Sequence, residues 1–426
     1  MIKSILFSLL LVLSVSCALQ PQTALKANEK AFEEEDLYIL LALYAKEEQA
    51  YDEAVSLFMT LYEKSAKKEY LYQSLESDLI GGKPKRLLQR VDSLDAEHAE
   101  DASLIRLKVV ALTQLHKFKE AKVLATALVK KTHLPDDYIL MSEVLVKLEQ
   151  FDLALKYLES AYAKEYNEQI LDRISIILYV NLSRAKDAIA YLETHTRIHG
   201  STEQILQRLI GFYSDQNNIE GLLHSYKRLY SINKDEQIAK KIVQIYAYKR
   251  DYLHLIDFLE SSRSDDRQLL ELYISSKNYK KAYPLAEELY RSRSEIEYLG
   301  QSAIFEYESA KDKNDTKLLK SVVDKLQRVA QKDSSPIYLN YLGYLLIDHE
   351  IDVKKGIAYI KRVLELEPDS AYYLDSLAWG YYKLGECKKA DTIIQRVLKL
   401  KGGDNIEVIE HAKAIKKCLK NKKGKK

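Results

Sequence analysis

Residues 336–368 read PIYLNYLGYLLIDHEIDVKKGIAYIKRVLELEP, and residues 371–400 read AYYLDSLAWGYYKLGECKKADTIIQRVLKL. In both stretches the apolar residues follow the spacing of amphipathic helices, and a short polar turn divides each stretch in two. Gly356 in the first stretch and Ala390 in the second occupy corresponding places, 34 residues apart. The two stretches are therefore predicted to be successive copies of one unit built from two helices.

The same unit recurs toward the N-terminus. An aromatic residue precedes a small one by three positions in Phe118–Ala121 and Phe151–Ala154, and Ala121 and Ala154 are 33 residues apart. A small side chain is needed where the second helix of a unit presses on the first, because a larger one would separate them. Related segments are Tyr51–Ala54, Ala185–Ala188, Tyr279–Ala282 and Cys387–Ala390.

A period near 34 residues made of two helices is the signature of tetratricopeptide repeats (TPRs). The two C-terminal units resemble that family in Leu342-Gly343, Gly356, Tyr359 and Pro368, and again in Leu377-Ala378, Tyr381, Gly385 and Ala390. We therefore predict an all-α TPR superhelical solenoid of about eleven helix-pair repeats over residues 34–419, ending in a capping helix at 405–419. The interval from Leu255 to Ala282 is shorter than one period and predicts a break in regular stacking.

Composition agrees with a helical array. The 426 residues include only 13 Gly and 6 Pro, so the turn-forming residues of a multi-strand fold are scarce. Lys and Arg total 65 against 63 Asp and Glu, a net charge of +2. That balance argues against nucleic-acid binding, which usually needs a strong basic excess on one face.

The N-terminus has the layout of a signal peptide over residues 1–17. Lys3 precedes an apolar stretch from Ile5 to Leu13, and small residues follow. Val15, Ser16 and Cys17 resemble the lipobox of bacterial lipoproteins, which implies lipidation of Cys17. Ser14 departs from that pattern, so ordinary cleavage near Ser16 or Ala18 is the alternative. Residues 18–33 are expected to form a flexible tether and residues 420–426 a disordered basic tail.

The resemblance to TPR proteins implies a concave, partner-binding surface lined by the first helix of each unit. It places seven exposed residues on that surface in the last two units: Asn340, Tyr341, Tyr344, Asp375, Ser376, Trp379 and Tyr382. Accessible Tyr and Trp favour contacts with proteins or extended peptide segments. The alternative is that these rings fill gaps between repeats.

The other two cysteines, Cys387 and Cys418, are predicted to form a disulfide. The chain rises about 20 Å from Cys387 to Leu400 and returns about 20 Å from Asn405 to Cys418 if both segments are helical. An antiparallel capping helix would thus bring the two sulfurs level, and an exported compartment would permit the bond. Rotation of the capping helix could still point them apart.

No motif predicts catalysis, a metal or a cofactor. His195 and His199 are four residues apart, but no further ligand completes a metal site. The signal, the lipobox-like Cys17 and the long array together are similar to TPR outer-membrane lipoproteins of Gram-negative bacteria. Some of those recruit substrates to carboxyl-terminal processing proteases, which implies a non-catalytic adaptor on the periplasmic side of the envelope. A structural subunit of an outer-membrane assembly, secretion or motility machine is the alternative.

Overall fold

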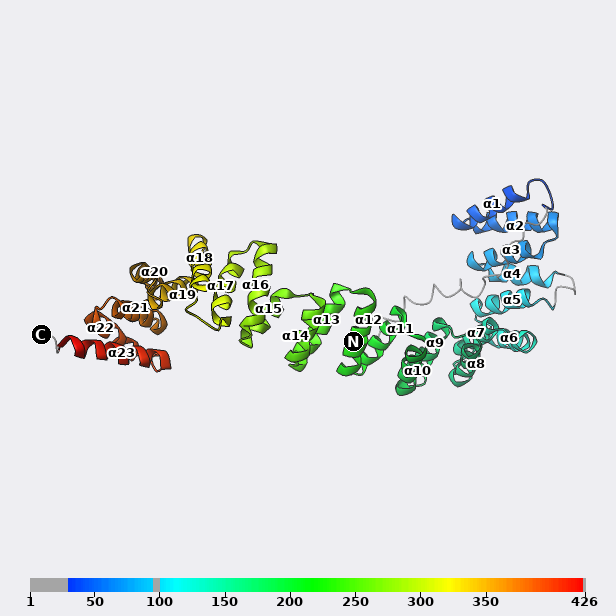
Figure 1. The fold of residues 1–426 in the computed structure, drawn as a ribbon. Coiled ribbons are helices and arrows are strands. Elements are labelled where there is room, and N and C mark those ends of the chain that lie inside the picture. Colours follow the sequence, from blue (N-terminus) through cyan, green and yellow to red (C-terminus); the bar gives the residue numbers. More distant parts are fainter. Residues whose placement is uncertain (1–29, 95–99, 424–426) are drawn as a thin grey trace. The chain divides into compact units, whose positions relative to one another are not determined.

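The computed structural model describes residues 30–94 and 100–423 (Figure 1). These residues form two compact units, one within residues 1–234 and the other within residues 235–426. Helices make up both units, and no strand occurs in the described ranges, so the prediction of an all-α chain is confirmed. The predicted signal peptide, Cys17, most of the tether and residues 424–426 lie outside the described residues.

The unit within residues 1–234 contains twelve described α-helices that pack as six consecutive pairs. Odd-numbered helices open each pair and are called A helices here; even-numbered helices close it and are called B helices. In order they are α1(Glu35–Glu47), α2(Tyr51–Ser65), α3(Lys68–Ile80), α4(Pro84–Asp92), α5(Ala102–Gln114), α6(Phe118–Thr132), α7(Pro135–Lys147), α8(Phe151–Lys164), α9(Glu168–Ile176), α10(Ala185–His199), α11(Glu203–Asp215) and α12(Ile219–Asn233). A short π-helical segment, η2(Ile177–Asn181), extends α9.

The unit within residues 235–426 continues the alternation with five further pairs and a final helix. They are α13(Glu236–Lys249), α14(Tyr252–Ser262), α15(Asp266–Ser275), α16(Tyr279–Arg293), α17(Ile296–Ser309), α18(Thr316–Lys332), α19(Pro336–Asp348), α20(Val353–Leu366), α21(Ala371–Lys383), α22(Cys387–Val397) and α23(Ile406–Lys423). Over the described ranges the chain is a TPR-type solenoid of eleven helix pairs with a C-terminal capping helix, as predicted.

Two boundaries differ from the sequence predictions. Helix α23 continues to Lys423, so residues 420–423 are helical and do not belong to a disordered tail. Lysine is a good helix former, and its charge is favourable at a helix C-terminus. The short interval between Leu255 and Ala282 coincides with two short helices, α14 of 11 residues, which begins just before it, and α15 of 10, and the pairing continues through it. The division between the compact units falls earlier, after Lys234.

The turns inside the helix pairs explain why so few glycines suffice. Ten of the eleven described turns contain one residue in the left-handed backbone region, with φ between +52° and +72°. Only Gly82 and Gly385 in this set are glycines, although glycine adopts that conformation most easily. The others are Gln49, His116, Glu149, Ser183, Asn217, Arg250, Lys277 and Glu350. The two flanking helices hold these side-chain-bearing residues in place.

Helix α1 is fixed to its unit by a buried carboxylate. One oxygen of Glu35, a residue 2% exposed, accepts hydrogen bonds from Lys67 Nζ and Tyr70 Oη, both at 2.6 Å. The other oxygen accepts one from the Ala31 amide at 2.7 Å. Burial acts to raise the pKa of Glu35, but these hydrogen bonds outweigh it and lower the pKa to about 2.

Glu35→Gln should therefore remove an acid-sensitive part of the stability of this unit. Because the folded pKa lies below the ordinary 4.5, the contribution of Glu35 is complete above that pH and is lost as pH falls toward 2. We expect the variant to lose about 2 kcal/mol at neutral pH, where Lys67 loses its charged partner. Urea unfolding at neutral pH and near pH 3 checks this: the gap between wild type and variant should narrow in acid. An equal gap at both pH values would contradict the assignment.

Candidate protein-binding surface

The seven predicted partner-binding residues lie on two neighbouring A helices, α19 and α21, which contact each other. Their spacings of three, four and seven residues put them on one face of each helix. The structure therefore brings the predicted residues together. It also adds α23, which packs against α21 and contributes Glu407 and His411 to the same area.

Three of the seven residues are not exposed as expected. Asn340 is fully buried, and Asp375 and Ser376 are 6% and 3% exposed. The Ser376 hydroxyl donates to the carbonyl oxygen of Tyr372 in its own helix at 3.2 Å, and Asp375 lies 2.9 Å from Nδ1 of His411. The predicted exposure of these three residues is wrong because adjacent A helices and the capping helix pack over them.

The remaining four residues keep part of their rings at the surface, and Tyr372, which sequence reasoning did not select, is 56% exposed beside them. We call Tyr341, Tyr344, Tyr372, Trp379 and Tyr382 the aromatic wall. Its central ring, Trp379, stacks on Tyr382 with centroids 4.6 Å apart and on His411 with centroids 4.0 Å apart. Stacking on both neighbours restricts the rotamers of this ring, so it is presented in a defined orientation.

The polar atoms of the aromatic wall donate to carboxylates on neighbouring helices. Tyr341 Oη donates to Glu308 and Tyr344 Oη to Glu407, both at 2.6 Å. The indole nitrogen Nε1 of Trp379 donates to Asp348 at 2.8 Å. Sequence reasoning missed these acceptors because they belong to α17, α19 and α23, and no spacing rule predicts which helices meet.

These contacts leave the surface acidic. Burial raises the pKa of the Tyr341 and Tyr344 hydroxyls, and the carboxylates beside them raise it further, so both stay protonated donors. A neutral donor does not cancel the charge of the carboxylate that accepts from it. Among the described residues, no Lys or Arg side chain forms an ion pair with Asp348, Asp375 or Glu407. The carboxylates of Asp348 and Glu407, which are partly or fully exposed, therefore lie among the aromatic rings, whereas Asp375 is buried against His411.

The A helices of the other unit present a different surface. Arg106 of α5 pairs with the fully buried Asp137 of α7 at 2.6 Å, and Asp172 of α9 pairs with Arg208 of α11 at 2.6 Å. Glu143 and Arg173 join α7 to α9 between them. Each ion pair links one A helix to the next, so these charges are already used inside the array.

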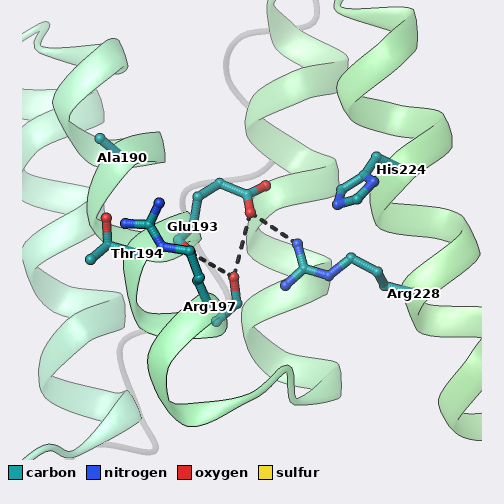
Figure 2. Close-up of a pocket in the computed structure, with 7 residues that line it drawn as sticks. Ala190, Glu193, Thr194, Arg197, His224 and Arg228 are labelled. Carbon is teal, nitrogen blue, oxygen red and sulfur yellow. Dashed lines mark hydrogen bonds and ion pairs between the residues drawn. The ribbon is translucent and has the colours of Figure 1, made fainter.

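A pocket of about 400 Å³ lies between α10 and α12 (Figure 2). Arg228 spans it and donates to Glu193 at 2.9 Å and to the Ser201 hydroxyl at 2.6 Å. Glu193 also accepts from the Tyr213 hydroxyl at 3.0 Å. Because Glu193 belongs to α10 and Arg228 to α12, their ion pair joins two B helices, and the other hydrogen bonds of both side chains go to surrounding residues of the array.

The histidines His195 and His199 pack against tyrosines. Nδ1 of His195 is 2.6 Å from the Tyr162 hydroxyl, and the ring of His199 lies 4.8 Å from that of Tyr166. In the described ranges, no group of three or more His, Cys, Asp or Glu residues is arranged to hold a metal ion. The i, i+4 histidine pair is thus accounted for by packing between neighbouring repeats.

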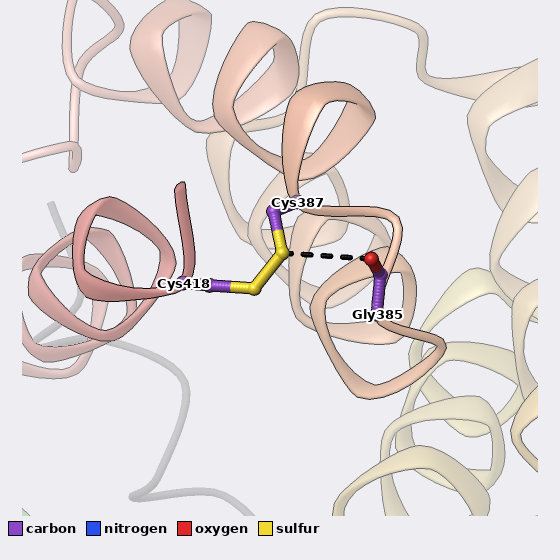
Figure 3. Close-up of a disulfide and its surroundings, with 3 residues drawn as sticks. All are labelled: Gly385, Cys387 and Cys418. Carbon is purple, nitrogen blue, oxygen red and sulfur yellow. Dashed lines mark hydrogen bonds between the residues drawn. A yellow bond between two sulfur atoms is a disulfide. The ribbon is translucent and has the colours of Figure 1, made fainter. Parts of the chain in front are cut away.

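Cys387 and Cys418 are joined by a disulfide (Figure 3). Their Cα atoms are 5.9 Å apart and 31 positions apart in sequence. Cys387 is the first residue of α22, and Cys418 lies near the end of α23. The bond links the capping helix to the last helix pair, at the opposite end of α23 from Glu407.

The fold and this surface define a class: a TPR-type helix-pair solenoid with an aromatic, acidic surface on its C-terminal A helices. Among solved structures, a chain of the APC/C hetero-tetramer Cut9-Hcn1 is similar over 90% of this chain and 97% of its own, with 11% identity and a TM-score of 0.38. YrrB, described as a TPR protein with an unusual peptide-binding site, is similar over 44% of this chain and 97% of its own, with 14% identity and a TM-score of 0.36.

MamA from Desulfovibrio magneticus RS-1 is similar over 41% of this chain and 99% of its own, with 15% identity and a TM-score of 0.34. These similarities concern the fold alone. No protein-family model matches the chain, and no curated protein sequence matches it.

Proposed function

We propose that this protein is a non-catalytic scaffold that binds an extended, Lys- and Arg-rich segment of a partner protein on the aromatic wall. The observation that carries this proposal is the combination of partly exposed rings with two carboxylates, those of Asp348 and Glu407, that have no lysine or arginine partner in the described structure. Cations bind to the faces of Trp and Tyr rings and form charge-assisted hydrogen bonds with carboxylates. The aromatic wall offers both within one surface.

The geometry favours a preformed site for such a segment. The hydrogen bonds of Tyr341, Tyr344 and Trp379 fix their rings before any partner arrives. Rigid aromatic anchors lose little conformational entropy on binding, which favours affinity. Lys383, whose Nζ lies 5.3 Å from the Trp379 ring centroid and 3.0 Å from Glu350, already shows this mode of contact within the chain.

The cellular setting of the proposal rests on the N-terminal sequence. A signal peptide followed by a lipidated Cys17 would place the array on the periplasmic side of the cell envelope.

 

The proposed anchor also limits which partners can reach the surface. Outer-membrane attachment would restrict them to envelope proteins, such as a periplasmic protease and the substrates it is to cleave. Within the described residues, no helix is both long and apolar enough to cross a bilayer, so in this proposal attachment depends on the N-terminal segment.

Binding of a fluorescein-labelled peptide rich in Lys and Arg to the purified full chain tests the surface. Tyr372→Ala should raise the Kd about tenfold, because an exposed ring can be removed without disturbing the core. Glu407→Gln should weaken binding and reduce its salt dependence, since one uncompensated charge is lost. Tyr248→Ala removes a 78% exposed Tyr from α13 of the same unit and should leave the Kd unchanged.

An Asp- and Glu-rich peptide of equal length is the ligand control. Equal binding of the two peptides, or equal effects of Tyr372→Ala and Tyr248→Ala, would contradict the proposed surface. The same three variants should then be used in pull-downs from crosslinked cell envelopes. Recovery of a protease with its substrates, lost in Tyr372→Ala, supports the adaptor role. A fixed set of membrane-machine subunits, unchanged in every variant, identifies a structural subunit instead.

A further inference from the structure

Helix α1 is the first helix of the described array (Figure 1, blue), and part of its apolar surface is exposed. Residues 37–45 read LYILLALYA, nine apolar residues in succession. Ala42 and Ala45 are buried against the rest of the unit. On another side of the helix, four apolar residues at positions i, i+3, i+4 and i+7 are exposed: Leu37 (52%), Leu40 (66%), Leu41 (43%) and Tyr44 (61%). We call these four residues the α1 stripe.

A helix that is apolar all round is normally covered on all sides. Contiguous exposed apolar patches of this kind mark interaction sites, whereas single exposed apolar residues are ordinary. The exposed Val123 of α6, for comparison, has no such stripe around it. The α1 stripe therefore needs a cover that the described residues do not supply.

The two ends of the array differ in this respect. Solenoids need terminal helices with a polar outer face to stay soluble. Helix α23 meets that need, because its exposed residues include Lys413, Lys416, Lys417 and Lys420. The exposed side of helix α1 instead carries the apolar residues of the α1 stripe. Its end of the array therefore presents the kind of surface on which a further helix packs inside a repeat protein.

Acidic residues flank the α1 stripe at both ends. Glu33 and Glu34 precede it and Glu47 and Glu48 follow it, and all four are exposed. The nearby lysines are engaged elsewhere: Lys30 pairs with Asp36 at 2.5 Å, and Lys46 with Glu76 at 2.8 Å. A ligand for this face must bury apolar surface in the middle and carry positive charge at both ends.

We propose that the α1 stripe docks one amphipathic helix of a partner protein, with leucine-like residues on its apolar face and Lys or Arg at both ends of that face. A helix laid along another presents apolar anchors at i, i+3 or i+4 and i+7, the same spacing as the α1 stripe. The two helices would pack at the usual 8–10 Å between axes. This surface is separate from the aromatic wall and does not depend on the function proposed for it.

Charge argues against the two obvious other occupants. A second copy docked through its own α1 in antiparallel register would place Glu34 near Glu47, and like charges in that position repel. An anionic bilayer would repel the four flanking glutamates as well. A basic, amphipathic helix satisfies both the apolar and the acidic parts of the surface.

The test uses the purified full chain carrying Tyr372→Ala and Glu407→Gln, which weaken binding at the aromatic wall, and a labelled synthetic peptide of about 15 residues, designed as a helix with a leucine stripe and lysines at both ends. A twin peptide has glutamates in place of the lysines. The lysine peptide should bind about tenfold more tightly than its twin, with an affinity that falls as salt is added. Leu40→Asp should weaken binding about 30-fold, because it places a charge in the apolar contact.

Two further variants make the result specific. Glu33→Lys with Glu34→Lys leaves the α1 stripe intact and should reduce the preference for the lysine peptide, because the acidic residues at one end of the stripe are reversed. Val123→Asp introduces the same charge at a 69% exposed residue of the same unit and should change nothing. Far-UV circular dichroism and the melting temperature of each variant separate loss of docking from loss of α1.

Four outcomes overturn the proposal. They are equal binding of the two peptides, unchanged binding by Leu40→Asp, concentration-dependent dimers that Leu40→Asp abolishes, and flotation with phosphatidylethanolamine–phosphatidylglycerol vesicles that Leu40→Asp abolishes. The third outcome identifies a second copy as the occupant, and the fourth identifies the bilayer. When the α1 substitutions are placed in a chain with an intact aromatic wall, α19 and α21 are untouched, so the peptide binding tested for the aromatic wall should persist.

Discussion

Replacing Gly356 with alanine should lower the free energy of unfolding of the unit within residues 235–426 by about 2 kcal/mol or more. An added Cβ at Gly356 would lie 2.6 Å from the Gly343 carbonyl oxygen and 2.7 Å from Cγ1 of Ile347. The nearest obstacle is backbone, so no change of rotamer relieves the clash. Helices α19 and α20 would have to separate at the point where they now touch.

The matched control is Gly211→Ala in α11, where an added Cβ meets nothing within 4 Å. Both substitutions replace a helical glycine and gain the same helix propensity, up to about 1 kcal/mol. The control should therefore be neutral or stabilising for its own unit, and the difference between the variants measures the clash. Urea unfolding followed by circular dichroism provides both values. A stabilised Gly356→Ala variant would show that α19 and α20 do not cross closely.

Cys418→Ser should release the capping helix and lower its stability by about 3.7 kcal/mol. In the chain-entropy model, a disulfide that closes a loop of this length stabilises the folded state by about that amount. The sequence separation of the two cysteines is 31 residues. The effect should be local, because α23 packs only on the last helices of the described array.

Trp379 allows this release to be measured directly. It is the chain's single tryptophan, and its ring stacks on His411 of α23. In Cys418→Ser, or in reduced wild type, tryptophan fluorescence should change at a lower urea concentration than the circular dichroism of the whole chain. The double variant Cys387→Ser with Cys418→Ser should unfold like the reduced wild type, and adding a reductant should not shift its fluorescence transition. Coincident fluorescence transitions in oxidised and reduced wild type would show that the disulfide does not hold α23.

The candidate site could be predicted only in part, and α19 and α21 show why. Helical spacing and the TPR resemblance placed Tyr341, Tyr344 and Trp379 on one surface, which the structure reproduces. They could not distinguish these residues from Asn340 and Asp375, because exposure depends on which neighbouring helix covers each position. Their roles in binding remain a prediction.

The carboxylates of the site were beyond prediction for a related reason. Glu308 and Glu407 lie 33 and 63 positions from the tyrosines that donate to them. Acidic residues are frequent throughout the chain, and nothing local distinguishes these two from those in solvent. Their importance follows from the contacts of α17 and α23 with α19 and α21.

The sequence by itself determined the parts of this protein that depend on local spacing. A period near 34 residues, small residues at helix crossings and apolar stripes specify helix pairs, because each pair must bury its stripes on its neighbours. The tertiary structure alone decided which side chains those neighbours cover. It buried Asn340, left the α1 stripe uncovered by the other described residues and set carboxylates against the aromatic wall, because burial and pairing depend on contacts between helices far apart in the chain.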